Sequence, residues 1–348
     1  MEAQVTAPNL LPAPTDPTDA PPLRWGILGA GGIARRFARE VPARSAQQVL
    51  AVASRDQRRA DAFAAEHGVG RAYGSYELLV TDEDVDVIYI ATPHSAHRDH
   101  ALLALEAGKH VLVEKAFTRN ADEALEVLDA ARERHLFVME AMWTRFLPHM
   151  VALRGLIGSG ALGEILAVTA DHGQRLDTVE RLLAPELAGG ALLDLGVYPV
   201  SFAYDVLGAP ASVHAAGVLT DVGVDAHEAV TLTYAGTRAV AVCTSNMWAT
   251  TATTASVVGT EGRVDIDGPF YRPTSFTVTP FSGAPWRFEP VPGITAADGG
   301  FEFQAAEVAR CVADGRRESV DMPWRATLEV MEVLDEVRRQ LGVVYPGE

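Results

Sequence analysis

The sequence lacks an excess of basic residues. Its 348 residues include 29 lysines and arginines against 46 aspartates and glutamates, which gives a formal net charge of −17. Nucleic acids and anionic membrane surfaces attract proteins through positive charge, so this balance argues against both as partners. An acidic chain that binds an anionic cofactor must instead concentrate its positive charges locally.

Cysteine is also scarce. Cys243 and Cys311 form no metal-binding or redox motif, and no pair of histidines has the spacing of metal ligands. We therefore expect no bound metal and a reducing, cytoplasmic setting. No basic segment precedes a hydrophobic core at the N-terminus, so a secretory signal is not predicted. The longest charge-free run, residues 239–260, is rich in Thr and Ser, which favours paired strands over a membrane helix.

Length and composition predict two globular domains. The hydrophobic fraction of 48% and the charged fraction of 22% are typical of a soluble protein with substantial cores. Residues 1–22 carry six prolines and no lysine or arginine, so we expect a disordered tail there. A change of pattern, described below, divides the rest into units of 23–146 and 147–348.

The most informative stretch is Leu23 to Ala34. An apolar run ends in Gly29, Ala30, Gly31, Gly32, Ile33 and Ala34, and a helical pattern follows, which gives strand, turn and helix with the spacing G-x-G-x-x-A. In such a turn the first glycine makes the bend, the second lets a pyrophosphate approach the backbone, and the alanine allows close packing. The helix start offers free N–H groups to the phosphates. This context predicts a dinucleotide site.

The end of the next strand indicates which dinucleotide is bound. After an apolar strand at 47–54, an NAD site would place an acid to bind the ribose 2′-hydroxyl. This chain has Ser54 and Arg55, with Arg59 one helical turn later. A hydroxyl and a guanidinium suit a 2′-phosphate, so we expect NADP, with NAD as the alternative. Asp56 argues against a preference for NADP. It either caps the helix at 56–67 or binds the ribose.

The pattern continues as strands alternating with helices, which predicts a doubly wound parallel α/β sheet. The expected strands are 85–92, 110–117 and 136–142, and the expected helices are 95–108 and 121–135. Ligands of such sheets lie beyond the carboxyl ends of the strands. The residues at those ends are therefore cofactor candidates: Thr92, Pro93, His94, His97, Glu114, Lys115, Trp143 and Arg145.

After Gly163 the pattern changes to period-two segments. Strands are expected at 164–171, 213–220, 229–234, 239–244, 255–258 and 275–279, with helices at 190–207, 299–313 and 324–341. Strands without intervening helices predict an antiparallel sheet, and hence an α+β second domain. Apolar residues on alternate positions leave one sheet face needing cover. We therefore expect a homodimer, or a dimer of dimers, that pairs through this sheet.

Three residues are candidates for proton transfer. Hydride transfer from a secondary alcohol to nicotinamide needs a group that takes the hydroxyl proton. Lys115 is expected to face the cleft, while Asp194 and Tyr198 are i and i+4 on one helix and share a face. A phenol beside an ammonium is expected to have a lowered pKa, which would suit Tyr198 to acid–base work. The alternatives are a surface lysine, its carboxylate partner and a core tyrosine.

Other side chains are candidates for contacting substrate or cofactor. His97 is a further proton-transfer candidate, although a helix-start histidine is often simply polar. Aromatic faces of Trp143, Trp248 and Phe270 would pack against the carbon-bound hydrogens of a sugar or diol, with core or dimer-interface packing as the alternative for the last two. His172 and Arg175 follow a strand of the second domain and are expected to reach substrate hydroxyls.

In their order along the chain, these motifs resemble those of the glucose–fructose oxidoreductase/inositol dehydrogenase (Gfo/Idh/MocA) family. They are the glycine turn, Ser-Arg, Thr-Pro-His-Ser-Ala-His at 92–97, Glu-Lys at 114–115 and Gly-Gly-Ala-Leu-Leu-Asp-Leu-Gly-Val-Tyr at 189–198. Three stretches, Met139 to Phe146, Phe301 to Ala305 and the ending Leu341 to Pro346, resemble its branch of dihydrodiol and NADP-dependent D-xylose dehydrogenases. The similarity covers residues 23–348.

The resemblance implies a Rossmann domain, an open-faced sheet domain and catalysis by Lys115, Asp194 and Tyr198. It favours an NADP-dependent dehydrogenase of a cyclic sugar, polyol or trans-dihydrodiol, with a D-xylose-like aldose preferred. A nicotinamide-dependent glycosidase and a non-catalytic dinucleotide sensor are the alternatives. Ala116 stands where the family usually has a proline, often in cis. A cis bond before another residue costs about 3–4 kcal/mol, so we expect a trans bond here.

Overall fold

The computed structural model describes residues 11–12, 15–289, 293–295 and 297–348. Its first unit is a parallel sheet of six strands in the order β3-β2-β1-β4-β5-β6. The strands are β1 (Arg24–Leu28), β2 (Gln48–Ala53), β3 (Arg71–Tyr73), β4 (Val87–Ile90), β5 (His110–Val113) and β6 (Val138–Glu140). This order reverses between β1 and β4, and ligands of doubly wound sheets bind at that reversal.

Helices connect these strands as predicted. They are α1 (Gly32–Arg44), α2 (Gln57–His67), α3 (Tyr76–Val80), α4 (His97–Glu106) and α5 (Ala121–Arg134). The short β3 and α3 were not expected, since neither is long enough to show a period. Every strand is parallel to its neighbours, and the alternation of strand and helix predicted this arrangement.

The second unit is a sheet of eight strands in the order β14-β13-β12-β11-β7-β10-β9-β8. Its strands are β7 (Ile165–Gly173), β8 (Ser212–Leu219), β9 (Asp225–Thr233), β10 (Val240–Asn246), β11 (Ala255–Gly259), β12 (Gly262–Ile266), β13 (Phe276–Pro280) and β14 (Trp286–Phe288). It is mainly antiparallel as expected, but β7 and β10 pair in parallel. The charge-free run at 239–260 forms β10 and β11.

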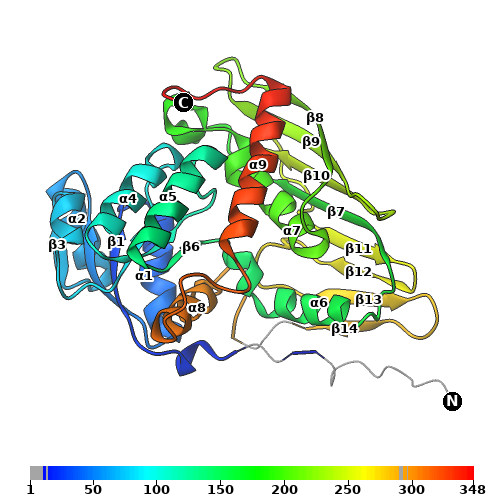
Figure 1. The fold of residues 1–348 in the computed structure, drawn as a ribbon, viewed down its shortest axis with the longest axis horizontal. Coiled ribbons are helices and arrows are strands. Elements are labelled where there is room, and N and C mark those ends of the chain that lie inside the picture. The colour runs from blue at the N-terminus through cyan, green and yellow to red at the C-terminus, as the bar shows by residue number, and fades with distance from the viewer. Residues whose placement is uncertain (1–10, 13–14, 290–292, 296) are drawn as a thin grey trace.

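Helices cover one face of this sheet. α7 (Val197–Leu207) lies against β7 and β10, and α9 (Trp324–Leu341) lies against β8, α7 and α5. α6 (Pro148–Gly158) lies on the same side, and among the described residues no helix covers the opposite face (Figure 1). One stretch, Pro185–Leu207, is long and apolar enough to cross a membrane, but 89% of its apolar window is buried inside the protein.

The last part of the chain returns to the first unit. α8 (Phe301–Ala313) packs against α1, so the predicted division at residue 146 separates segments that meet again in space (Figure 1). The predicted disordered tail also needs correction at its end. Ala20 is buried with Ala306 and Ala309, and Arg310 donates to the Asp16 carbonyl at 2.7 Å. Residues 1–10 and 13–14 of that tail lie outside the described residues.

Candidate active site

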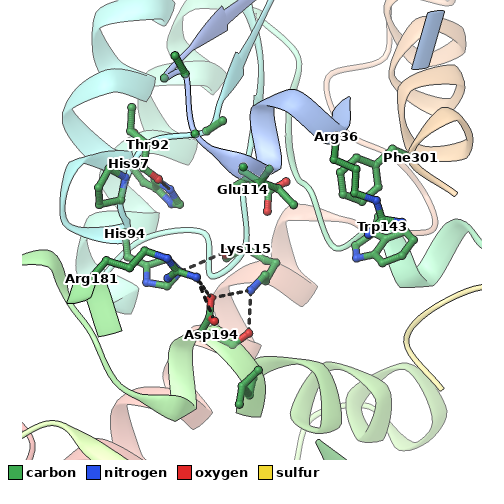
Figure 2. A pocket seen from close by; sticks show the side chains of 18 of the residues that line it. Arg36, Thr92, His94, His97, Glu114, Lys115, Trp143, Arg181, Asp194 and Phe301 are labelled. Atoms are coloured by element: carbon green, nitrogen blue, oxygen red, sulfur yellow. Dashed lines mark hydrogen bonds and ion pairs between the residues drawn. The ribbon is translucent and has the colours of Figure 1, made fainter. Parts of the chain in front are cut away.

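A cleft of about 720 Å³ lies between the two units. The first unit contributes the loops that follow β1, β2, β4 and β5, and the second contributes residues from β7 and from the segment that enters α7. Figure 2 shows Lys115, from the first unit, in direct contact with Asp194, from the second. The cleft therefore lies beyond the carboxyl ends of the parallel strands, where the sequence predicted a ligand.

The glycine turn forms one end of the cleft. Gly29 has a φ of +104°, and a Cβ on it would lie 2.7 Å from the carbonyl oxygen of Ala91, so only glycine fits. A Cβ on Gly31 or Gly32 would meet no atom within 4 Å, and α1 begins here without a side-chain cap. Open space beside free helix N–H groups suits a pyrophosphate. Predicted residues 29–33 line the cleft, whereas Ala34 is fully buried behind them.

The end of β2 brings the predicted cation group to the same cleft. Ser54, Arg55, Asp56 and Arg59 all line it. Asp56 Oδ1 accepts from the backbone N–H of Arg58 at 2.9 Å, so this carboxylate caps α2. Tyr76, which was not predicted from the sequence, also lines this part of the cleft. Burial raises the pKa of Tyr76, and the nearby charges of Arg55 and Arg59 partly counteract that rise.

Two histidines hold the loop that carries Lys115. The Nε2 atom of His94 lies 3.2 Å from the carbonyl oxygen of Lys115, and the Nδ1 atom of His97 lies 3.0 Å from that of Ala116. The other ring nitrogen of His97 lies 2.9 Å from the Thr92 carbonyl oxygen. Burial lowers the pKa of His94 to about 3 and that of His97 to about 4. His97 therefore positions backbone, which corrects its prediction as a proton-transfer residue.

The bond between Lys115 and Ala116 also corrects an expectation. The structure has this peptide bond in cis, although Ala116 stands where the resemblance leads one to expect proline. Ala116 is fully buried.

Lys115, Asp194 and Arg181 form one ionic cluster. Lys115 Nζ donates to the backbone carbonyl of Asp194 at 2.7 Å and to its Oδ1 at 3.2 Å. From the other side, Arg181 Nη2 lies 3.1 and 3.2 Å from the two carboxylate oxygens, as the dashed lines in Figure 2 mark. Burial opposes charge on Asp194, but these two cations lower its pKa overall. The carboxylate therefore stays ionised.

The backbone around Asp194 explains how its carbonyl reaches Lys115. The helix predicted over 190–207 begins as a π turn, Leu192–Gly196, and becomes the α-helix α7 only from Val197. A π turn offsets the regular hydrogen bonds of a helix, and such turns are frequent at functional sites. The Asp194 side chain is only 10% exposed, between the two cations.

The side-chain amine of Lys115 is protonated at neutral pH. Burial alone would lower its pKa, but Asp194, Tyr198 and Glu114 outweigh burial, and the pKa is raised. Glu114 is itself buried, accepts a hydrogen bond from the Tyr89 hydroxyl, and has a pKa raised by burial. At neutral pH the ammonium of Lys115 is therefore a charged donor that points into the cleft.

Tyr198 lies beside this ammonium, with its ring centroid 5.0 Å from Lys115 Nζ. Its hydroxyl accepts a hydrogen bond from Trp143 Nε1 at 3.1 Å. The predicted lowering of its pKa is wrong in sign: burial raises the pKa to about 12, and Lys115 offsets only part of that rise. In the free protein the phenol is protonated and ready to donate.

His172 and Gln174, from β7 and the residues after it, also line the cleft. The ring of His172 lies 4.3 Å from that of Tyr271, centroid to centroid, and burial with the charge of Lys115 lowers the His172 pKa to about 3. Gln174 Nε2 donates to the Tyr271 hydroxyl at 2.8 Å. These groups present uncharged polar atoms, which suits a hydroxylated ligand.

Five predicted residues lie outside the cleft. Ala34 is buried behind the glycine turn, and local geometry explains the other four. Trp143 lines it, but Arg145 points away in the same short 3₁₀ turn and contacts Ser201 and Asp205. Arg175 is exposed and pairs with Asp177, because the side chains on the cleft side belong to residues 172 and 174.

The two aromatic predictions fail in similar ways. Phe270 is fully buried against Phe202, while its neighbour Tyr271 turns into the cleft. Trp248 follows β10, is 42% exposed and does not line the cleft. The cleft residues that were not predicted from the sequence are Arg36, Tyr76, Ala91, Gln174, Arg181, Leu195, Tyr271, Arg272 and Phe301. Leu195 and Phe301 belong to stretches that carry the family resemblance, but neither was predicted as a site residue. The others belong to no motif and reach the site through tertiary folding.

Among the described residues, no group of three or more His, Cys, Asp or Glu side chains is placed to hold a metal.

The chain matches two family models: "Oxidoreductase family, NAD-binding Rossmann fold" over residues 23–142 and "GFO/IDH/MocA C-terminal domain" over residues 150–265. The chain belongs to the Gfo/Idh/MocA oxidoreductase family. The resemblance first noted in the motifs is thereby confirmed.

Similar proteins narrow the branch of this family. The chain is 40% identical to a trans-1,2-dihydrobenzene-1,2-diol dehydrogenase of Danio rerio, over 93% of this chain and 98% of that one. It is 35% identical to a D-xylose 1-dehydrogenase (NADP⁺) of Hypocrea jecorina, over 93% of both chains. Among solved structures, an aldose-aldose oxidoreductase from Caulobacter crescentus superposes with a TM-score of 0.83 at 25% identity, covering 92% of this chain and 98% of that one.

Proposed function

We propose that this protein is an NADP-dependent oxidoreductase that transfers hydride between the nicotinamide and a secondary carbinol of a cyclic sugar, polyol or trans-dihydrodiol. A D-xylose-like aldose is the favoured substrate. The observation that carries this proposal is the cluster of Lys115, Asp194 and Tyr198 in the same cleft as the glycine turn. Relatives that share most of the chain's length are named for these two kinds of substrate.

The cleft fits NADP at both ends. The open backbone at Gly31 and Gly32 would hold the pyrophosphate, and Ser54, Arg55 and Arg59 would hold a 2′-phosphate. When bound, NADP supplies the hydride acceptor, and its reduced form supplies the hydride. The chain's own side chains must then position the substrate and move one proton.

The proton is handled at the Tyr198 hydroxyl. In carbonyl reduction the protonated phenol donates to the substrate oxygen, and in alcohol oxidation it must first be deprotonated to accept the hydroxyl proton. Lys115 donates to the same substrate oxygen and favours the phenolate by its charge. Asp194 orients Lys115 through two contacts. Tyr198 is thus the acid–base group, and Lys115 is the ammonium that assists it in a position fixed by Asp194.

The direct test is absorbance at the reduced-nicotinamide band after mixing the protein with NADP and D-xylose. A panel of sugars, cyclic polyols and trans-dihydrodiols is run beside it with both cofactors. We expect the absorbance to rise with at least one ring carbinol and to rise faster with NADP than with NAD. No reduction of either cofactor by any member of the panel would contradict the proposal.

Arg55→Ala should separate the two cofactors. A charge-assisted hydrogen bond to phosphate contributes about 1.5–3 kcal/mol, so the NADP dissociation constant should rise by about 10- to 100-fold while that for NAD changes little. Binding of both is measured by titration calorimetry. Arg58→Ala is the matched control, because Arg58 lies three residues later, in the first turn of α2, and does not line the cleft. Equal losses for both cofactors would show that Arg55 does not contact the 2′-phosphate.

We also propose a homodimer, or a dimer of dimers, that pairs through the uncovered sheet face. On β10, Val240 and Val242 are each 39% exposed and alternate with buried Ala241 and Cys243. Val218 on β8 is 52% exposed. Apolar side chains on an open sheet face favour pairing with a second copy.

Light scattering at micromolar concentration should therefore give at least twice the mass of one chain. Val242→Asp should lower that mass to the mass of one chain, because it places a charge within the proposed interface. Leu78→Asp is the control, since Leu78 is an exposed apolar residue of the other unit. A monomer in the unmodified protein would refute the pairing.

We retain a cytoplasmic location as a proposal. Both cysteines are free and buried in the structure. Free thiols are typical of proteins kept in a reducing compartment. Fractionation of the source cells with an antibody to the protein would test the location.

A further inference from the structure

Arg181 is a cleft residue to which the proposed reaction gives no role. It lies in a 3₁₀ turn, Glu180–Leu183, thirteen residues before Asp194. Its Nη2 atom is shared between both oxygens of the Asp194 carboxylate, while Lys115 contacts only one of them. The Arg181 side chain is 47% exposed, yet it lines the cleft. An arginine that contacts both oxygens of a buried carboxylate restrains the orientation of that carboxylate.

The turn that carries Arg181 is anchored rather than loose. The next residue, Leu182, is fully buried in a small cluster with Ala191, Leu195 and Met247. Its carbonyl oxygen accepts from the backbone N–H of Gly190 at 3.0 Å. A Cβ on Gly189 would lie 2.5 Å from that same oxygen, so glycine allows the turn to approach the start of the π turn.

We propose that Arg181 is a positioning residue of this reaction: it fixes the Asp194 carboxylate and thereby limits how strongly Lys115 holds its proton. With Arg181 present, Asp194 divides its charge between two cations. Without it, the whole carboxylate is available to Lys115. The inference deepens the proposed function, because Lys115 in turn acts on Tyr198 and the substrate oxygen.

The surroundings of Lys115 support this direction. The groups that face it are Asp194 from the π turn, Tyr198 from α7, Glu114 from the end of β5, Arg181 from the 3₁₀ turn, His94 from the loop after β4 and His172 from β7. The two histidines are neutral at ordinary pH. The three acidic groups raise the pKa of Lys115, and Arg181 is the cation that lowers it. Removing Arg181 should therefore raise that pKa.

The chain offers a clean way to measure this effect, because Lys115 and Lys109 are its only lysines. Lys109 Nζ donates to the carbonyls of Asp82 and Val85, both at 2.7 Å, and does not line the cleft. Competitive labelling with acetic anhydride, read by peptide mass spectrometry at about pH 8–10, reports the free-amine fraction of each lysine. Lys109 serves as the internal reference.

In Arg181→Met, we expect the labelling of Lys115 relative to Lys109 to fall below that of the wild type. The smaller side chain would, if anything, admit more reagent, so a fall identifies charge rather than access. Arg181→Lys keeps the positive charge and should restore the ratio. Arg175→Met is the matched control on the same segment, and it should leave the ratio unchanged. An unchanged or increased ratio in Arg181→Met would overturn the proposal.

Kinetics provide a second readout. Arg181→Met should lower kcat by about 10- to 100-fold through misplacement of Lys115, with the NADP dissociation constant unchanged. Circular dichroism and NADP binding check that each variant is folded, and Arg181→Gln, which also removes the charge, carries the test if Arg181→Met does not fold. Labelling needs no substrate. A failure of the proposed function and a failure of this inference are therefore distinguishable.

Discussion

Lys115→Met should lower kcat by about 10²- to 10⁴-fold, the usual share of a positioned acid–base group, while NADP still binds. Met has a similar length but no charge, so it neither donates to the substrate oxygen nor favours the phenolate of Tyr198. Asp194 keeps its partner Arg181 on both oxygens, so the carboxylate is not left unpaired. The glycine turn and Arg55 hold other parts of the cofactor. The loss should therefore appear in turnover.

Lys109→Met is the matched control, because it removes the other lysine, which donates to two backbone carbonyls and does not line the cleft. It should leave kcat near that of the wild type. The measurement is the initial rate of cofactor reduction at saturating NADP and substrate, beside NADP binding by calorimetry. Near-normal turnover in Lys115→Met would show that the assigned site is wrong. His97 would not replace it, since both of its ring nitrogens contact backbone carbonyls.

The fold was largely predictable because its signals are local. Alternation of strand and helix in the first unit, and period two in the second, need only neighbouring residues. The helix predicted at 324–341 has those bounds in the structure. Elements that were missed, such as β3 and α6, are short or begin in a stretch without a clear period. The pairing of β7 with β10 in parallel depends on contacts between distant segments.

Individual site residues were predictable where a motif fixes the backbone. The glycine turn, Ser54 and Lys115 stand at strand ends, and strand ends of a parallel sheet share one edge. It was harder to predict which of two adjacent side chains turns into the cleft. The cleft holds Gln174 rather than Arg175, and Tyr271 rather than Phe270. Both choices follow from register and packing that no local pattern records.

Signs of electrostatic effects were the least predictable feature. Proximity of Tyr198 to Lys115 was expected to lower the phenol pKa, but burial outweighs it. Arg181 could not be predicted as a site residue either, because no sequence pattern links a cation to a carboxylate thirteen residues later, as Arg181 is linked to Asp194. Burial and long-range pairing are properties of the folded chain, and they decide the chemistry of this site.

Tyr198→Phe should lower kcat by about 10²- to 10⁴-fold and should remove the alkaline rise of alcohol oxidation. Because burial raises the Tyr198 pKa to about 12, the phenol is protonated in the free enzyme at neutral pH. Alcohol oxidation needs the deprotonated form, whose fraction grows about tenfold per pH unit below the pKa. In the wild type, kcat/KM for oxidation should therefore rise with pH. Carbonyl reduction uses the protonated form and should stay flat until strongly alkaline pH.

Tyr271→Phe separates this role from the loss of any hydroxyl in the same aromatic group. The ring of Tyr271 lies 4.7 Å from that of Tyr198, and its hydroxyl accepts from Gln174 and Arg272. That variant should change KM more than kcat and should keep the alkaline rise, since Tyr198 still titrates. The measurement is kcat/KM for oxidation across the alkaline range with all three proteins. An alkaline rise that persists in Tyr198→Phe would assign the proton to another group, and Lys115 would then be the base.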